Sequence, residues 1–455
     1  MGEEMKNRSE RDMDLARKIA RDVCAAGGRA YFVGGVVRDG LVGLETKDID
    51  LEIYGVSPEE LREILRGIGE VYEKGAAFGV LSLRGTNLDI AMPRTESVIG
   101  PGHRDFDVAV DPALSPQRAS RRRDFTINAM MRDVLTGEIL DFWGGRKDLE
   151  GRIVRHVADD TFPEDPLRVF RAAQFAARFR ARIAPETIEL CRDMEVRSLS
   201  KERVFEELSK ALLKADRPSI FFESLREMEQ MHEFFPEIEK MIGVPQNPQY
   251  HPEGDVFRHT MLVVDQAASL RDQAKWPLAF MLSALCHDLG KIDSTEISPD
   301  GRITSYLHPI TGQALAETQL GRWTSHRKLL RYVENMVEMH MRPNQLAMCR
   351  SKKKKTRQMF DASECPEDLI LLSRADASGK RDAPYDIRLE EFLRERLEDY
   401  RQVLREKMVT GEDLQRAGFS PDARFGQMLR RARELHFSGY PADQALKQIV
   451  REFPK

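Results

Sequence analysis

The sequence predicts an α+β protein, in which a small mixed β-sheet head is followed by an all-α remainder. The 455 residues allow about three structural units at about 150 residues per domain. Hydrophobic residues make up 41% and charged residues 32% of the chain, which indicates a globular protein and excludes a disordered, fibrous or membrane protein. Short β-like runs occur in the first 150 residues, whereas helical periodicity dominates after Glu164.

Charge and cysteine content narrow the function classes. Lys and Arg number 71 against 75 Asp and Glu, so any nucleic-acid partner must meet a local basic patch. The five cysteines never form a C-x-x-C pair, which argues against a disulfide framework or a cysteine zinc site. The longest apolar stretch, Pro277 to Cys286, is too short to span a bilayer. We therefore expect a cytoplasmic protein.

The expected strands, helices and breaks divide the chain into four predicted domains. Strands are expected at 31–33, 49–54, 80–83 and 88–92, and helices at 167–179, 204–213, 255–268, 277–289, 329–341 and 369–377. A Pro/Asn/Gly cluster between Gly243 and Gly254 interrupts the helical region, because proline disfavours helix at and before its own position. The predicted domains are 1–150, 151–245, 246–385 and 386–455.

A glycine turn follows the first expected strand. Backbone N–H groups at Gly34 and Gly35 could approach a phosphate there, and Arg38 would add a fixed positive charge. An ordinary turn that binds no phosphate is the alternative interpretation of these glycines.

Two aspartates begin the next expected strand. Period-two geometry points Asp48 and Asp50 to the same face, and two such carboxylates can hold a divalent metal for phosphoryl transfer. Asp89, on a neighbouring expected strand, is a candidate third carboxylate. A solvated strand edge is the alternative interpretation of all three residues.

Three motifs together resemble a known family. Gly34 to Asp39, Asp48 to Asp50 and Arg122 to Ala129 resemble, in order and spacing, the class II CCA-adding tRNA nucleotidyltransferases and the related bacterial poly(A) polymerases. The resemblance implies a nucleotidyltransferase head with catalytic Mg²⁺ on the two aspartates. It also implies triphosphate contacts from the glycine turn and Arg38, and ribose contacts from two further residues, Arg123 and Asp124.

The neck that follows carries a second motif of this family. Residues 141–149 resemble its hinge, and Glu164 to Arg171 its E-D-x-x-R motif. If a helix opens at Glu164, then Asp165, Arg168 and Arg171 share one face and can read a base edge. The resemblance implies that Asp165 and Arg168 pair with CTP or ATP. The loop 93–105 resembles the family's flexible loop, which is associated with switching from C to A addition. An enzyme that adds only A is still an alternative interpretation.

Histidines and aspartates after the junction indicate a second metal centre. They lie on several expected helices, so a helical bundle would have to bring them together. Their order resembles the HD-domain metal-dependent phosphohydrolases, which implies four central ligands, His259, His287, Asp288 and Asp376, and two second-metal ligands, His308 and His340. Mixed imidazole and carboxylate ligands suit Mn, Ni or Mg. For each histidine alone, an ordinary core role is the alternative.

A basic segment offers a site for RNA. Between Gln319 and Arg357 there are eleven Lys or Arg and two Glu, including the run Lys352 to Lys355. Such a run is either a solvated face or a contact for the phosphate backbone of tRNA.

Head and tail together resemble the multifunctional CCA proteins. The predicted function is a tRNA nucleotidyltransferase that adds or repairs the 3′-terminal CCA using CTP and ATP, with an HD phosphohydrolase domain. Its expected partners are the tRNA 3′ end, CTP and ATP, but neither DNA nor a membrane. Three alternatives remain: an A-adding enzyme or poly(A) polymerase, an HD phosphohydrolase with an RNA-binding head, and a noncatalytic RNA-binding scaffold.

Overall fold

The computed structural model describes residues 2–44, 46, 48–74, 80–98, 106–380 and 385–453. Side chains are described within these ranges except at 2–9, 95–98 and 106–109. Two compact units are present: Met1–Leu199 with Glu227–Gln230, and Ser200–Arg226 with Met231–Lys455. The predicted boundaries at 150, 245 and 385 divide the chain more finely and stay a prediction.

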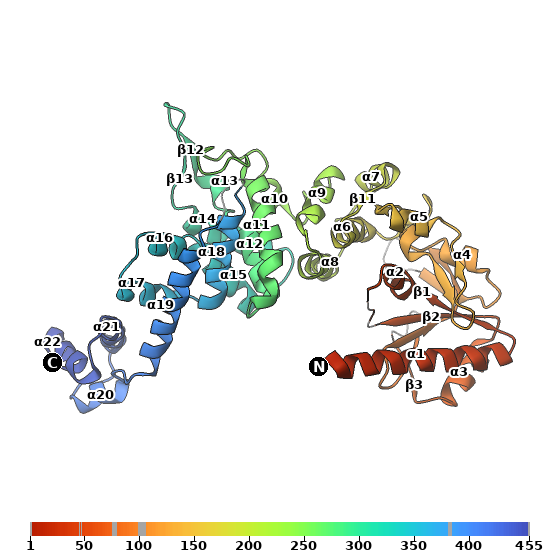
Figure 1. The fold of residues 1–455 in the computed structure, drawn as a ribbon, viewed down its shortest axis with the longest axis horizontal. Helices are drawn as coiled ribbons and strands as arrows, with labels where there is room; N and C mark the ends of the chain where they lie inside the picture. The colour runs from red at the N-terminus through yellow and green to blue at the C-terminus, as the bar shows by residue number, and fades with distance from the viewer. Residues whose placement is uncertain are drawn as a thin grey trace. The chain divides into compact units, whose positions relative to one another are not determined.

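A seven-stranded mixed sheet forms the head of the first unit (Figure 1). Its strand order is β3-β4-β5-β2-β1-β8-β9, with β2 parallel to β5 and the other neighbours antiparallel. The predicted small mixed sheet is confirmed. The strands are β1 (Arg29–Val33), β2 (Ile49–Tyr54), β3 (Val71–Glu73), β4 (Leu81–Leu83), β5 (Leu88–Ala91), β8 (Met131–Asp133) and β9 (Ile139–Leu140).

Alternation along β2 gives the sheet one apolar and one polar face. Ile49, Leu51 and Ile53 are buried in a core shared with α1 (Gly2–Ala25) and α3 (Pro58–Arg66). Asp50 and Glu52 point to the opposite face, as the two-residue period of a strand requires. This second face, called the polar face below for its carboxylates, also carries a smaller apolar cluster that includes Tyr31, Val33 and Met131.

The remaining elements of the first unit surround and extend the head. A separate two-stranded sheet is formed by β6 and β7, and another by β10 and β11. The elements are α2 (Gly35–Leu41), β6 (Arg94–Val98), β7 (Phe106–Val110), α4 (Pro116–Ser120), η1 (Thr126–Asn128), α5 (Gly145–Glu150), β10 (Ile153–Val154), η2 (Phe162–Glu164), α6 (Arg168–Phe179), β11 (Arg182–Ile183) and α7 (Pro185–Arg192).

The second unit is helical apart from the hairpin β12–β13, as predicted. Helices α11, α12, α15 and α18 pack against one another and bring distant segments together. The elements up to α18 are α8 (Lys201–Lys214), α9 (Ser219–Glu227), α10 (Pro236–Glu239), α11 (Val256–Leu270), η3 (Arg271–Gln273), α12 (Pro277–Cys286), α13 (Lys291–Ser294), β12 (Thr295–Ile297), β13 (Ile303–Ser305), α14 (His308–Gly321), α15 (Arg327–Met339), α16 (Arg342–Met348), α17 (Lys353–Ala362) and α18 (Pro366–Ser378).

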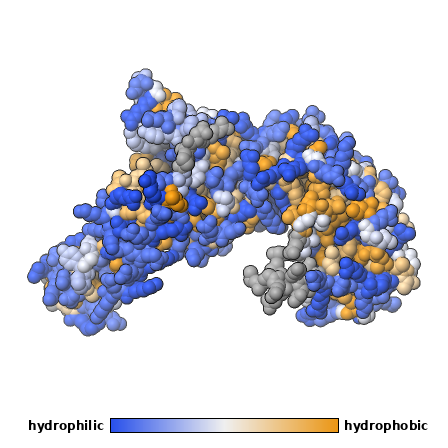
Figure 2. Space-filling model, in the orientation of Figure 1, coloured by the Kyte–Doolittle hydropathy of each residue, from blue (hydrophilic) through white to orange (hydrophobic). Residues whose placement is uncertain are grey.

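The C-terminal helices have a small core of their own, which includes Leu414, Met428 and Ile449. In the view of Figure 2 these helices present mainly hydrophilic residues, whereas hydrophobic residues gather around α2 in the head. Among the described residues, no helix is long and apolar enough to cross a membrane. The last helices are α19 (Ile387–Arg405), α20 (Gly411–Arg416), α21 (Phe425–Phe437) and α22 (Ala442–Glu452).

Candidate active sites of the two units

A cavity of about 370 Å³ opens on the polar face of the head sheet. Asp50 and Asp89 are register partners on the parallel strands β2 and β5, so their side chains lie next to each other on this face. Across the cavity lie guanidinium groups that could meet a polyphosphate. The charged lining residues are Asp50, Glu52, Asp89, Arg94, Arg122, Arg123 and Arg168.

The glycine turn lies against this carboxylate pair. Gly34 has φ +66°, in the left-handed region that favours glycine. A Cβ on Gly34 would lie 3.7 Å from Asp50 Oδ2 and 3.5 Å from Arg123 Nη1. The turn, the carboxylate and the arginine therefore meet at one point, as the predicted phosphate site requires.

The carboxylates of the head lie beside basic side chains. Burial raises the pKa of Asp50, and the Arg123 guanidinium opposes that rise. Arg123 donates to Glu52 at 2.7 Å, and Lys74 contacts Asp89 at 2.9 Å. A buried carboxylate that resists ionisation gains from a cation beside it, so Asp50 fits a hard divalent metal, and Asp89 offers an adjacent carboxylate.

Asp48 lies outside the head cavity, whereas Asp50 lines it. Strand β2 begins at Ile49, and Asp48 precedes it as an exposed residue that does not line the cavity. The expected strand 49–54 is observed as β2, and Asp48 lies immediately before its first residue. The role of Asp48 at the metal stays a prediction, whereas Asp89 lies directly beside Asp50.

Arg38 is a buried structural residue in this structure. Its side chain donates to Asp39 at 2.7 Å and to Asn128, and its guanidinium lies 4.9 Å from the ring centroid of Phe175. It is 4% exposed and does not line the cavity. Its predicted contact with the triphosphate stays untested, as do the contacts predicted for Gly34 and Gly35.

Asp124 is likewise held by protein partners. It pairs with Arg171 at 2.6 Å and accepts from the side-chain amide of Asn128 at 3.0 Å. Burial opposes its ionisation, but Arg171 and Asn128 outweigh burial and lower the pKa of Asp124. This pair fastens α6 to the head. The predicted ribose contact of Asp124 stays a prediction.

Asp165 does not lie on the helix face that we expected it to share with Arg168 and Arg171, which are both in α6. Helix α6 begins at Arg168, and Asp165 lies before it with φ −124° and ψ 101°. The reason is Pro166, because a residue that precedes proline is driven out of the helical region. Asp165 accepts from the backbone N–H of Leu167 at 3.1 Å.

Arg168 connects α6 to the arginines of the head. It donates to the carbonyl oxygens of Thr161 at 2.6 Å and Arg122 at 2.7 Å, and it lines the head cavity. The first helical residue of α6 therefore positions the segment that carries Arg122 and Arg123.

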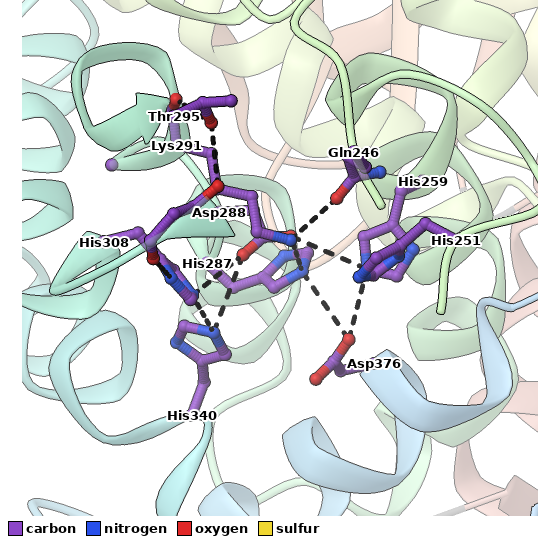
Figure 3. Close-up of polar contacts among 12 residues, drawn as sticks. Gln246, His251, His259, His287, Asp288, Lys291, Thr295, His308, His340 and Asp376 are labelled. Carbon is purple, nitrogen blue, oxygen red and sulfur yellow. Dashed lines mark hydrogen bonds and ion pairs between the residues drawn. The ribbon is translucent and has the colours of Figure 1, made fainter. Parts of the chain in front are cut away.

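The second unit brings the six predicted metal ligands together (Figure 3). His287 and His340 lie at the ends of α12 and α15, and His308 at the start of α14. His259 and Asp376 belong to α11 and α18. Possible ligand atoms converge within 4.8 Å in two groups that contain all six residues: His259, His287 and Asp376, and Asp288, His308 and His340.

A glycine permits this convergence. A Cβ on Gly290, in the turn after α12, would overlap the carbonyl oxygen of His308 and lie 2.6 Å from the backbone nitrogen of Gly312. Only glycine allows the start of α14 to approach so closely, and this approach places His308 beside Asp288, with Nε2 3.3 Å from Oδ1.

The imidazoles present one type of nitrogen to the centre. Carbonyl oxygens of Ala284, Ser305 and Val337 contact Nδ1 of His287, His308 and His340 at 2.7–2.8 Å. A carbonyl can only accept, so each Nδ1 carries the proton and each Nε2 keeps its lone pair. Nε2 of His287 is buried and has no hydrogen bond. These donors fit a metal ion.

The pKa shifts agree with this protonation pattern at His340 and His308, whereas at His259 burial is outweighed by hydrogen bonds with Asp376 and Glu253, which raise the pKa. Burial lowers the pKa of His340 to about 3 and also lowers that of His308. Burial opposes ionisation of Asp288, but the ammonium of Lys291, at 2.7 Å, outweighs it and lowers the pKa of Asp288. Neutral imidazoles and an ionised carboxylate are the forms that bind metal.

Two residues of this centre were missed in the sequence. Glu253 and His251 lie in the turn before α11, and Glu253 Oε1 is 2.8 Å from His259 Nδ1 and 2.9 Å from His251 Nδ1. Both belong to the Pro/Asn/Gly cluster, which we interpreted only as a boundary. The signal available was the histidine and glutamate pair close before a predicted ligand.

A second cavity, of about 540 Å³, contains part of this centre. Asp288, His308 and Asp376 lie in its wall, together with three cationic side chains, Lys291, Arg302 and Lys380. The wall therefore combines candidate metal ligands with positive charge. It suits an anionic substrate.

The basic segment spans the end of α14 to α17. Lys352 to Lys355 are exposed, and Lys353 contacts Asp399 at 2.6 Å. Their contact with tRNA stays a prediction.

Comparison with known families assigns the head to a class. Residues 30–155 match the family described as "Poly A polymerase head domain", and residues 182–242 match "Probable RNA and SrmB- binding site of polymerase A". The glycine turn, the carboxylates and the cavity arginines Arg94, Arg122 and Arg123 lie in the first match, whereas Arg168 lies after it. The head is thus that of a nucleotidyltransferase, a family that generally depends on divalent metal.

Curated relatives extend the match into the second unit. The Multifunctional CCA protein of Actinobacillus pleuropneumoniae serotype 5b is 37% identical over 362 residues, which cover 77% of this chain and 85% of the relative. That of Hahella chejuensis is 34% identical over 420 residues, covering 87% and 95%. The chain belongs to the multifunctional CCA protein family. The predicted enzyme class, a CCA-adding nucleotidyltransferase, is confirmed.

Solved structures share the fold. The Thermotoga maritima CCA-adding enzyme complexed with tRNA_CCA has a TM-score of 0.62 at 18% identity and covers 96% of this chain and 95% of its own. A CCA-adding enzyme complexed with CTP has a TM-score of 0.64 at 18% identity, with 96% and 93% covered. At these identities the likeness concerns the fold alone.

Proposed function

We propose that this protein adds or repairs the 3′-terminal CCA of tRNA from CTP and ATP without a nucleic-acid template. The observation that carries the proposal is the head cavity, where the Asp50 and Asp89 carboxylates face arginines beside a glycine turn. Structures of CCA-adding enzymes with the same fold hold tRNA_CCA, ATP or CTP, and this supports the same substrates here.

The residues of the head divide into two roles. Asp48, Asp50 and Asp89 would hold Mg²⁺, which when bound neutralises the triphosphate and activates the RNA 3′-hydroxyl. Arg123 lies beside Asp50 and is fixed by Glu52, so it can orient a phosphate without reorganising. Asp165 and Arg168, at the start of α6, would select the base.

The test uses tRNAs that lack one, two or three nucleotides of the terminal CCA. Each is incubated with labelled CTP, ATP or both, and the products are sized on a sequencing gel. A CCA-adding enzyme completes all three and stops, whereas an A-only enzyme extends only the tRNA that lacks the last nucleotide. A poly(A) polymerase would continue past the complete end, and no incorporation would contradict the proposal.

We further propose that the second unit is an HD-type phosphohydrolase. Four imidazole nitrogens and two carboxylates converge there, from helices far apart in the sequence. His259, His287, Asp288 and Asp376 would hold a divalent ion such as Mn, Ni or Mg, with His308 and His340 available to a second ion. The bound metal would supply an activated water for attack on a phosphate ester.

The cationic wall of the second cavity supports this chemistry. Lys291, Arg302 and Lys380 can bind the phosphate oxygens and keep the ester facing the ligands. Hydrolysis of p-nitrophenyl phosphate and of a phosphodiester analogue, measured after chelation and after adding back each metal, tests the proposal. No hydrolysis with any metal would contradict it.

A further inference from the structure

The four imidazoles of the second centre are not oriented in the same way. His287, His308 and His340 each use Nδ1 to contact a backbone carbonyl of their own segment. His259 instead uses Nδ1 to contact a carboxylate, Glu253 Oε1, at 2.8 Å. Its Nε2 faces Asp376 Oδ1 at 3.1 Å. A side chain therefore sets the orientation of this one ring.

The Glu253 side chain is buried, and its carboxylate contacts two histidines. Its side chain is 1% exposed, and the same Oε1 lies 2.9 Å from Nδ1 of His251. Its other oxygen, Oε2, is buried without a hydrogen-bond partner. Burying a carboxylate is unfavourable unless its contacts compensate, so the two imidazoles are what retain Glu253 in this place.

We propose that Glu253 is a positioning residue of the second centre. Its carboxylate accepts a hydrogen bond from Nδ1–H of His259, fixes that tautomer and directs the Nε2 lone pair toward the metal. A carboxylate behind a metal-bound imidazole also increases the basicity of the ligand. The proposal rests on the proposed phosphohydrolase centre and adds to it a residue outside the ligand set.

An additional metal site is the competing interpretation, because His251, Glu253 and His259 also form a convergent group. A metal between them would have to replace the proton on His259 Nδ1. The three other imidazoles of the centre carry their proton on Nδ1, so His259 with a protonated Nδ1 matches them. The geometry therefore favours positioning over ligation.

The test measures metal binding by the full-length protein. After chelation, Mn²⁺ is titrated by calorimetry into the wild type, Glu253→Gln and Glu253→Ala. We expect Glu253→Ala to bind about 10- to 100-fold more weakly and Glu253→Gln to fall between, because an amide oxygen still accepts but carries no charge. Hydrolysis by Glu253→Gln should recover as Mn²⁺ is raised, whereas that of His287→Ala should not.

Glu237→Gln is the matched control. Glu237 is also a buried glutamate of the second unit, 3% exposed. It forms an ion pair with Arg322, an exposed residue at the C-terminal end of α14. We expect its metal affinity to stay within about threefold of the wild type. An equal loss in this control would overturn the proposal, because neutralising any buried glutamate would then suffice.

Two further outcomes would also overturn it. Unchanged affinity in both Glu253 variants would remove the positioning role. Loss of one Mn²⁺ equivalent in His251→Phe would establish the additional metal site instead. If His287→Ala binds Mn²⁺ as the wild type does, the proposed phosphohydrolase centre itself is wrong, and this result separates the two failures.

Discussion

The two centres of this protein are built by different means. In the head, Asp50 and Asp89 meet because they are partners on adjacent parallel strands. In the second unit, the proposed metal ligands come from α11, α14, α18 and the ends of α12 and α15. Strand register therefore places the first site, whereas the packing of a helical bundle places the second.

Their electrostatics differ as well. The head carboxylates are matched by cations, since Arg123 contacts Glu52 and Lys74 contacts Asp89. The second centre has more neutral donors, and its imidazole rings are held by backbone carbonyls and by Glu253. The head therefore combines carboxylates with cations suited to a polyphosphate, whereas the second centre gathers imidazoles and carboxylates suited to an ion. This difference predicts that each site can be disabled without the other.

The largest expected effect is that of Asp50→Asn in the head. The substitution keeps the shape of the side chain and removes its charge, so nucleotide incorporation into tRNA should fall about 1,000-fold, or roughly 4 kcal/mol in activation free energy. Hydrolysis by the second unit should be unchanged. Glu59→Gln, at an exposed position of α3, is the control. An Asp50→Asn protein that still completes a truncated tRNA would refute the role of Asp50.

His287→Ala is the reciprocal experiment. It removes a completely buried ligand whose Nε2 has no protein hydrogen bond, so we expect phosphate-ester hydrolysis to fall about 1,000-fold. Incorporation of labelled ATP should remain at the wild-type rate. Equal loss of both activities would show that the two centres are not independent.

Gly290→Ala tests how closely α14 must approach the turn after α12. Because the new Cβ would overlap backbone atoms, we expect a destabilisation of about 1–3 kcal/mol and weaker Mn²⁺ binding. Gly321→Ala is the matched control in the same unit, since its Cβ would enter open space. Thermal unfolding and calorimetry measure the two effects. Wild-type behaviour of Gly290→Ala would show that the helix can move away at no cost.

Arg171→Ala tests the fastening of α6 to the head. Loss of the Asp124 pair should destabilise the protein by about 1–2 kcal/mol at pH 7, a value reduced because Arg171 is 31% exposed. The pKa of Asp124 is lowered in the fold, so the pair stabilises fully above its usual pKa of about 4 and is lost as pH falls through the lowered value. The difference in urea midpoint should therefore shrink below about pH 4. A difference that is constant with pH would contradict this assignment.

The neck shows where local interpretation fails. Acidic residues and proline before an apolar run predicted a helix from Glu164, but α6 begins at Arg168 because Pro166 keeps Asp165 extended. Both signals lie in the same few residues, and helix-start rules and proline rules point in different directions. Asp165 and Arg171 therefore do not share a helix face, contrary to the prediction.

The sequence by itself determined the mixed sheet of the head, the helical second unit and the residue types of both centres, since strand and helix periods and metal-ligand chemistry are local properties. Only the tertiary structure decided that Asp89 adjoins Asp50, that Arg38 and Asp124 are occupied by protein partners, and that Glu253 stands behind His259. The pairing of Asp50 with Asp89, of Arg38 with Asn128 and of Asp124 with Arg171 joins segments that are distant along the chain, whereas Glu253 is close to His259 in sequence and reaches it through the turn before α11. Close packing and the pairing of buried charges settle such contacts, and no local pattern encodes them.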